Sequence, residues 1–237
     1  MFVFKRKNIV IFGVFMLVII AFITVLGALI QVPTAKDDSL LTVVIDAGHG
    51  GIDNGVSGKV TGVRESELNL IISKKLGAYF KSAKFRVVYT RSTDAGLYGV
   101  VTTSLKKKDM QKRKEIILKT KPSLVISIHM NYYTLSSRRG GQVFYKDKDE
   151  NGKLLAECIQ QSFNSMEEAS RTCNILTGDY YILNCSPCPS VIAECGFLSN
   201  KEDELLLTNS DYQDKIAYAI FKGSISYLAS CSTYKPM

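Results

Sequence analysis

The sequence predicts an α/β fold, a mostly parallel, twisted sheet with helices on both faces, preceded by one N-terminal transmembrane helix. Beyond residue 40, short apolar runs typical of buried strands alternate with longer segments of helical period. This alternation favours a parallel sheet covered on both sides. Hydrophobic residues make up 46% of the 237 residues, which excludes a disordered or low-complexity chain.

The N-terminal segment predicts a membrane anchor. Residues 9–30 carry Thr24 as their only conventionally polar side chain, and as a helix this run would extend about 33 Å, enough to cross a bilayer. Three basic residues at 5–7 precede it, so the positive-inside rule places the N-terminus in the cytoplasm and the rest outside. A cleaved signal peptide is the competing interpretation. We favour the anchor because the run is long and a cut after Ala28 would put Leu26 where a small residue is needed.

The segments are therefore expected in a simple order: a basic cytoplasmic segment (1–8), the anchor or uncleaved signal (9–30), a linker (31–39), one folded domain (40–231) and a tail (232–237). The formal charge is +8. A basic surface suits a cell-wall polymer, a membrane surface or nucleic acid, and the extracytoplasmic placement disfavours nucleic acid. We interpret the basic run 106–114 as a solvated helix face.

The strands are predicted from short apolar runs bounded by polar or turn residues. In chain order they are expected at 41–45, 85–89, 124–128, 142–145, 180–183 and 190–193.

The helices are predicted from apolar residues that recur with a period of 3.6. They are expected at 67–82, 104–119 and 153–168. Two more helices close the chain, and each follows a capping box, Ser199 with Glu202 and Ser210 with Gln213.

Candidate functional residues follow three of the predicted strands. The carboxyl ends of central parallel strands are where chemistry is expected. The chain has two histidines, and both stand there, His49 after the first strand and His129 after the third. Glu194 follows the last strand, and the glycine-rich segment 50–62 folds back to deliver Glu65 near the start of the next helix.

Two imidazoles and one carboxylate form the ligand set of a catalytic zinc, which keeps its fourth position open for water. We therefore expect one Zn²⁺ held by His49, Glu65 and His129, with Glu194 across the site as a base. The alternative is that each histidine is a structural residue, hydrogen-bonded near a turn.

Five ordered motifs carry a resemblance to a known family. They are VVIDAGHGG (43–51), GVRESEL (62–68), VVYTRSTD (87–94), LVISIHMN (124–131) and VIAECGFLSN (191–200). In this order and spacing they resemble the zinc-dependent N-acetylmuramoyl-L-alanine amidases of the Amidase 3 family, over roughly residues 41–228. The short, anchored architecture resembles in particular the CwlD-type amidases of the spore cortex.

The resemblance implies a fold, a reaction and a site. His49, Glu65 and His129 match the family's zinc ligands, and Glu194 matches its catalytic carboxylate. The implied substrate is peptidoglycan, cut at the amide between N-acetylmuramic acid and L-alanine of the stem peptide. The implied role is spore cortex maturation, in the muramic-lactam pathway needed for germination. The alternative is an inactive peptidoglycan-binding protein that kept the fold.

Delivery to the substrate follows from the architecture. We expect the catalytic domain to be tethered outside the cytoplasm, in the forespore intermembrane space if the cortex role holds. Because no wall-binding repeat follows Leu228, an accessory activating protein is a further expected partner.

Two smaller assignments stay open. Asp46 either accepts a hydrogen bond that orients His49 or only caps the loop. The six cysteines are interpreted mainly as small buried residues or free thiols. A disulfide between Cys185 and Cys188, or a second zinc site there, is the alternative.

Overall fold

The structure is a computed structural model that describes residues 16, 19, 41–99, 103–169 and 171–233. Apart from Met16 and Ile19, the predicted anchor and linker lie outside these residues. Among the described residues, no helix is both long and apolar enough to cross a membrane. The chain divides into two units, Met1–Ser39 and Leu40–Met237, and the sheet and the candidate site belong to the second.

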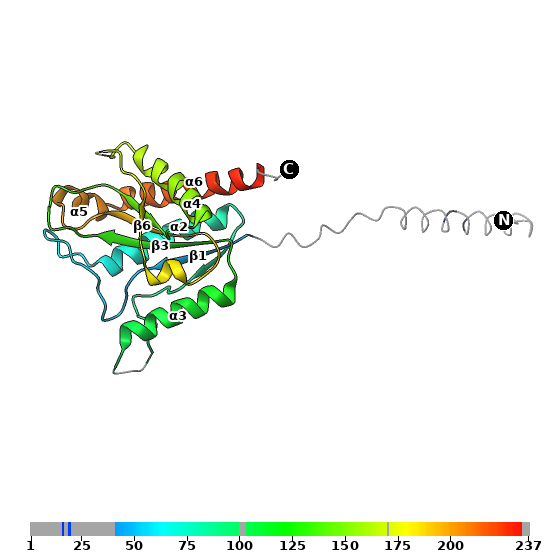
Figure 1. Cartoon of the computed structure of the whole chain (residues 1–237), viewed down its shortest axis with the longest axis horizontal. Helices are drawn as coiled ribbons and strands as arrows, with labels where there is room; N and C mark the ends of the chain where they lie inside the picture. Colours follow the sequence, from blue (N-terminus) through cyan, green and yellow to red (C-terminus); the bar gives the residue numbers. More distant parts are fainter. Residues whose placement is uncertain (1–15, 17–18, 20–40, 100–102, 170, 234–237) are drawn as a thin grey trace, which may run out of the picture. The chain divides into compact units, whose positions relative to one another are not determined.

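A six-stranded sheet forms the centre of the second unit (Figure 1). Its strands are β1 (Thr42–Ala47), β2 (Arg86–Tyr89), β3 (Leu124–Asn131), β4 (Gln142–Tyr145), β5 (Leu176–Thr177) and β6 (Ser190–Phe197). The order across the sheet is β2-β1-β3-β6-β4-β5, and the β4–β6 pair alone is antiparallel among these neighbours. The predicted mostly parallel sheet is confirmed.

Helices cover both faces of this sheet, as predicted. On one face lie α2 (Glu65–Ser82), α4 (Glu150–Asn164) and α6 (Ser210–Thr233), and on the other lies α3 (Leu105–Thr120) (Figure 1). A short helix, α5 (Lys201–Leu207), follows β6. Alternating residues of β1 serve the two layers, because Val43 and Ile45 join the core with α2 while Val44 packs in the second core with Ile117 of α3.

One predicted strand is wrong. The segment 180–183 forms a 3₁₀ helix, η1 (Tyr181–Asn184), closed by a hydrogen bond from the Leu183 N–H to the Tyr180 carbonyl. Ile182 and Leu183 are buried against the α3 side of the sheet. The run was apolar enough for a strand, but a single turn buries the same two side chains while leaving both tyrosines exposed.

The two predicted capping boxes are also wrong, because asparagines cap both helices. The Asn200 side chain accepts from the N–H groups of Glu202 and Asp203 at the start of α5, and Asn209 caps α6 in the same way. The hydroxyl of Ser199 instead accepts a hydrogen bond from the Tyr133 N–H. Asparagine competes well for this position.

Helix α3 is attached to the sheet by a buried ion pair, which corrects the interpretation of the run 106–114 as a solvated face throughout. Lys106, Lys107 and Lys108 are exposed, but Arg113 is 1% exposed. Its Nη1 lies 2.6 Å from Oδ1 of Asp46 in β1. The Asp46 carboxylate also accepts hydrogen bonds from the hydroxyls of Thr90 and Ser127. Burial alone would raise the pKa of Asp46, but the Arg113 charge and these donors lower it to about 2.

We expect Asp46→Asn to destabilise the protein by about 3 kcal/mol near neutral pH, because it leaves the buried guanidinium without its counter-ion. The pKa of Asp46 falls from 3.8 to about 2 on folding, so the ionised carboxylate stabilises the fold above about pH 4. That contribution, worth about 2 kcal/mol, is lost as the pH falls towards 2.

Denaturant unfolding of wild type and Asp46→Asn between pH 7 and pH 3 measures the difference in their free energies of unfolding. This difference should become smaller as the pH falls. The exposed substitution Glu157→Gln is the control and should change the free energy of unfolding by less than about 0.5 kcal/mol. A difference between wild type and Asp46→Asn that is constant over this range would contradict the assignment.

A second prediction concerns the contact between α4 and α6. A Cβ at Gly223 of α6 would lie 2.5 Å from the Ile159 Cα and 2.7 Å from the Cys158 carbonyl oxygen, both backbone atoms of α4. Gly223→Ala should therefore lower the free energy of unfolding by about 1–3 kcal/mol. The exposed Ser226→Ala on the same helix should have almost no effect. Denaturant unfolding measures both variants. Equal free energies of unfolding for Gly223→Ala and Ser226→Ala would show that α4 and α6 have room for a methyl group at this contact.

Candidate metal centre

The four predicted site residues meet at one edge of the sheet. His49 lies two residues beyond β1, and Glu65 is the first residue of α2. His129 and Glu194 lie inside β3 and β6, opposite each other in the parallel register. Both strands run further than predicted, so these two side chains are held by the sheet and not by loops.

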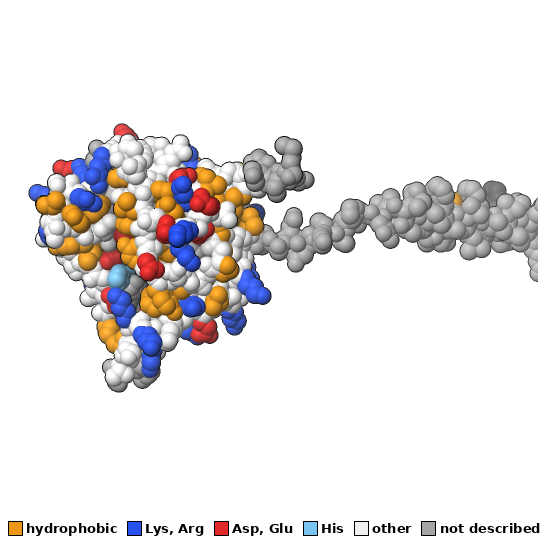
Figure 2. All heavy atoms as spheres, in the orientation of Figure 1, with side chains coloured by type: hydrophobic (Ala, Val, Ile, Leu, Met, Phe, Trp, Pro, Cys, Tyr) orange, Lys and Arg blue, Asp and Glu red, His pale blue; other side chains and the backbone are white. Residues whose placement is uncertain are grey.

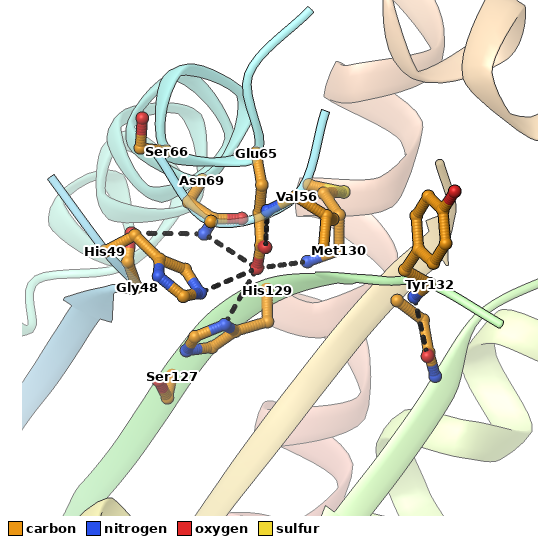
Figure 3. Close-up of polar contacts among 12 residues, drawn as sticks. Gly48, His49, Val56, Glu65, Ser66, Asn69, Ser127, His129, Met130 and Tyr132 are labelled. Carbon is orange, nitrogen blue, oxygen red and sulfur yellow. Dashed lines mark hydrogen bonds and ion pairs between the residues drawn. The ribbon is translucent and has the colours of Figure 1, made fainter. Parts of the chain in front are cut away.

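The buried Glu65 carboxylate is the centre of the cluster (Figure 3). Its Oε1 lies 2.9 Å from Nδ1 of His129 and 3.3 Å from Nε2 of His49. The Met130 N–H donates to Oε1 and the Val56 N–H donates to Oε2. Burial opposes ionisation of Glu65, but the histidine hydrogen bonds and charges hold its pKa well below the usual range. The carboxylate is therefore ionised at neutral pH.

The His49 ring lies beside an acidic residue that the sequence analysis missed. Its Nδ1 lies 2.9 Å from Oδ1 of Asp53, four residues along the glycine-rich loop, and its Nε2 faces Glu65. Burial lowers the pKa of His49, but Glu65 and Asp53 outweigh it and raise the value. Asp46 is bound by Arg113, Thr90 and Ser127 instead. The Asp46 carboxylate therefore satisfies buried donors beneath the loop, and Asp53 is the carboxylate beside His49.

Glu194 differs from Glu65 in having no hydrogen bond at one buried oxygen. Among the described residues, its Oε2 has no partner. Burial raises the pKa of Glu194 to about 7, Glu65 adds to this rise, and the two histidines oppose it. A carboxyl group that titrates near neutral pH is suited to take up and release a proton.

The close approach of the turn after β1 to strand β3 depends on Gly48. A Cβ at this position would lie 2.2 Å from Cε1 of the His129 ring. The His49 and His129 rings are 5.1 Å apart between centroids, at an angle of 76°. A side chain at position 48 would displace the His129 ring from this arrangement.

The cluster opens into a cleft of about 580 Å³. His49, His129 and Glu194 line it together with aromatic and basic side chains, among them Tyr98, Lys106, Tyr180 and Tyr181. Figure 2 shows a histidine side chain exposed on one face of the molecule, with acidic and basic side chains beside it. Tyr181 belongs to the 3₁₀ helix η1, so the turn found in place of the predicted strand forms part of the cleft wall.

All six cysteines are free. Cys185 is buried, with its thiol against the Tyr181 carbonyl, and Cys188 accepts from the Ser186 hydroxyl. Burial raises the pKa of both thiols. They carry no disulfide in the structure, and in the described part of the chain the one cluster with metal-ligand spacing is the His49, Glu65 and His129 group, whose ligand atoms lie within 4.8 Å of one another.

Comparison with known proteins gives the same family as the motifs. The family model for Amidase_3, described as N-acetylmuramoyl-L-alanine amidase, matches residues 43–226. The germination-specific N-acetylmuramoyl-L-alanine amidase of Bacillus subtilis is 32% identical over 190 residues, which cover 78% of each chain.

Solved structures agree. The CwlD amidase from Clostridioides difficile, solved in complex with the GerS lipoprotein, aligns with a TM-score of 0.78 and 36% identity, covering 80% of this chain and 99% of that one. The amidase AmiC2 of Nostoc punctiforme aligns with a TM-score of 0.69 and 30% identity, covering 80% and 97%. The family match spans most of the sheet and all four site residues, and the chain therefore belongs to the Amidase_3 family of N-acetylmuramoyl-L-alanine amidases.

Proposed function

We propose that this amidase is zinc-dependent, that His49, Glu65 and His129 hold one Zn²⁺, and that Glu194 is the catalytic carboxylate. The observation that carries the proposal is the cluster itself, in which two imidazoles and a buried carboxylate converge beside a second carboxyl group with an unpartnered oxygen. The substrate is peptidoglycan, cut between N-acetylmuramic acid and L-alanine.

The donor set fits zinc better than the other common divalent ions. Two nitrogen donors and one oxygen donor suit Zn²⁺, whereas Mg²⁺ and Ca²⁺ prefer oxygen alone. Nδ1 of His49 faces Asp53, and Nε2 faces the cluster. A carboxylate beside the second ring nitrogen is common for a ligating histidine.

The reaction divides between the metal and the chain. Zinc, when bound, supplies the Lewis acidity that activates water and polarises the amide carbonyl. Glu194 accepts the proton of the attacking water at its carboxylate and later delivers it to the leaving nitrogen of L-alanine. Its place opposite His129 in the neighbouring strand, at the wall of the cleft, suits both steps. The cleft beside the cluster, walled by Tyr180 and Tyr181, accommodates the polymer.

The same proposal assigns the enzyme to spore cortex maturation, in the muramic-lactam pathway needed for germination. Two similarities support this role, the one to the germination-specific amidase of Bacillus subtilis and the one to CwlD. Muropeptide analysis tests it: cortex from a strain lacking the gene should lack muramic lactam, and the purified enzyme should release stem peptides that begin with L-alanine.

Delivery is the remaining part of the proposal. The apolar run 9–30 anchors the catalytic domain (40–231) through the linker 31–39, outside the cytoplasm and in the forespore intermembrane space. The CwlD relative was solved with a lipoprotein bound, which supports a protein partner for this chain too. Activity of the purified domain that is already maximal without any partner would argue against one.

We expect His129→Ala to lose zinc and activity together, because it removes one of the three ligands. Metal analysis after dialysis and an assay on purified peptidoglycan measure the two effects. The exposed Tyr133→Ala, on the loop after β3, is the control and should keep its zinc. Full zinc and full turnover in His129→Ala would contradict the ligand set.

Glu194→Gln should keep its zinc and lose about a hundredfold or more in rate, the usual scale of general acid–base catalysis. The same metal analysis and assay distinguish this outcome from ligand loss. Zinc missing from Glu194→Gln would make Glu194 a ligand. If wild type itself binds peptidoglycan without releasing peptide, the alternative of an inactive binding protein holds.

A further inference from the structure

The turn that carries His49 presents three successive backbone carbonyls to two buried arginines. Nε and Nη2 of Arg91 donate to the carbonyls of Ala47 and Gly48, at 2.9 and 2.8 Å. Arg113 donates to the carbonyls of Ala47 and His49, at 2.7 and 2.6 Å. Neither arginine belongs to the metal cluster, and both are at most 3% exposed. Two cationic side chains thus hold the backbone from which the His49 imidazole projects.

The conformation of His49 makes this support necessary. Its φ of 60° lies in the left-handed region, which is unfavourable for a residue other than glycine. A charge-assisted hydrogen bond to the carbonyl of His49 itself offsets this cost and fixes the direction of its peptide plane. With the peptide plane fixed, the Cα–Cβ bond points the ring toward Glu65.

Arg113 can fix that carbonyl because its own guanidinium is held on the other edges. Nη1 contacts the Asp46 carboxylate at 2.6 Å, and Nε donates to Oδ2 of Asp109, one turn earlier in α3, at 2.5 Å. The other oxygen of Asp109 accepts from the Leu97 N–H. The planar guanidinium of Arg113, a fork of N–H donors, therefore contacts two carboxylates and two carbonyls at once. A lysine ammonium has too few fixed donors to make all four contacts.

We propose that Arg113 is a positioning residue for the metal centre: it acts through the His49 carbonyl to hold that ligand in the conformation that binds zinc. The proposal rests on the proposed zinc site and goes beyond it, because Arg113 contributes no ligand atom to the cluster and contacts His49 only through its backbone carbonyl. Loss of the fork lowers metal affinity while the fold persists, provided that a positive charge still faces Asp46.

The test therefore uses Arg113→Lys, which keeps the charge and removes the fork. Zinc affinity is measured on the metal-free protein by competition with a chromophoric chelator, and the melting temperature of the same metal-free protein reports the fold. We expect affinity to fall about tenfold or more, the usual scale for residues that orient a ligand. The metal-free protein should still unfold cooperatively, at a lower melting temperature, because a lysine leaves some of the buried acceptors unpaired. Arg139→Lys is the matched control, since Arg139 pairs with Glu202 and Asp203 and with no carbonyl of the turn.

The outcomes separate this proposal from the zinc assignment. Wild type that binds no zinc would overturn the metal centre. Wild type, Arg113→Lys and Arg139→Lys that bind zinc equally would overturn the role of Arg113 alone. If Arg113→Lys does not fold, Asp109→Asn is the variant that tests the proposal. It replaces the charged acceptor of Arg113 Nε by a neutral one, so the guanidinium is held less firmly. Zinc affinity should then fall about threefold, and unchanged affinity in Asp109→Asn would overturn the proposal.

Discussion

A buried, ionised carboxylate must be surrounded by donors, and Glu65 meets that requirement by drawing three separate parts of the chain together. Backbone N–H groups come from the glycine-rich loop and from β3, and the imidazoles come from the ends of β1 and β3. An unpaired charge here would cost several kcal/mol. The arrangement of the loop, of the two central strands and of the first turn of α2 follows from this one constraint.

The same principle operates one layer deeper. Asp46 and Arg113 neutralise each other beneath the turn, and the guanidinium then uses its remaining donors on backbone carbonyls. One ion pair therefore connects α3 to the sheet and the sheet to the conformation of His49. Glu194 stands outside this network, and its unpartnered buried oxygen is what sets it apart chemically from the two paired carboxylates.

Much of this was predictable because periodicity and strand-end chemistry are local signals. The two histidines and Glu194 follow apolar runs, a glycine-rich segment leads to Glu65, and all four come together in the structure. Asp53 and Arg113 were missed because their roles depend on three-dimensional neighbours: one is an acid in a flexible-looking loop, and the other stands among lysines. The strand predicted at 180–183 was wrong for a related reason. An apolar run of four residues suits a strand and a buried turn equally, and the structure has a turn there.

X-ray absorption spectroscopy of the zinc-loaded protein tests the central claim, the identity of the ligands, most directly. With His49, Glu65 and His129 as ligands, zinc should be surrounded by nitrogen and oxygen only, with the outer scattering of two imidazole rings. Six free cysteines offer an alternative set of ligands in the same chain. Sulfur at about 2.3 Å from zinc would exclude this ligand set and place the metal at the thiols.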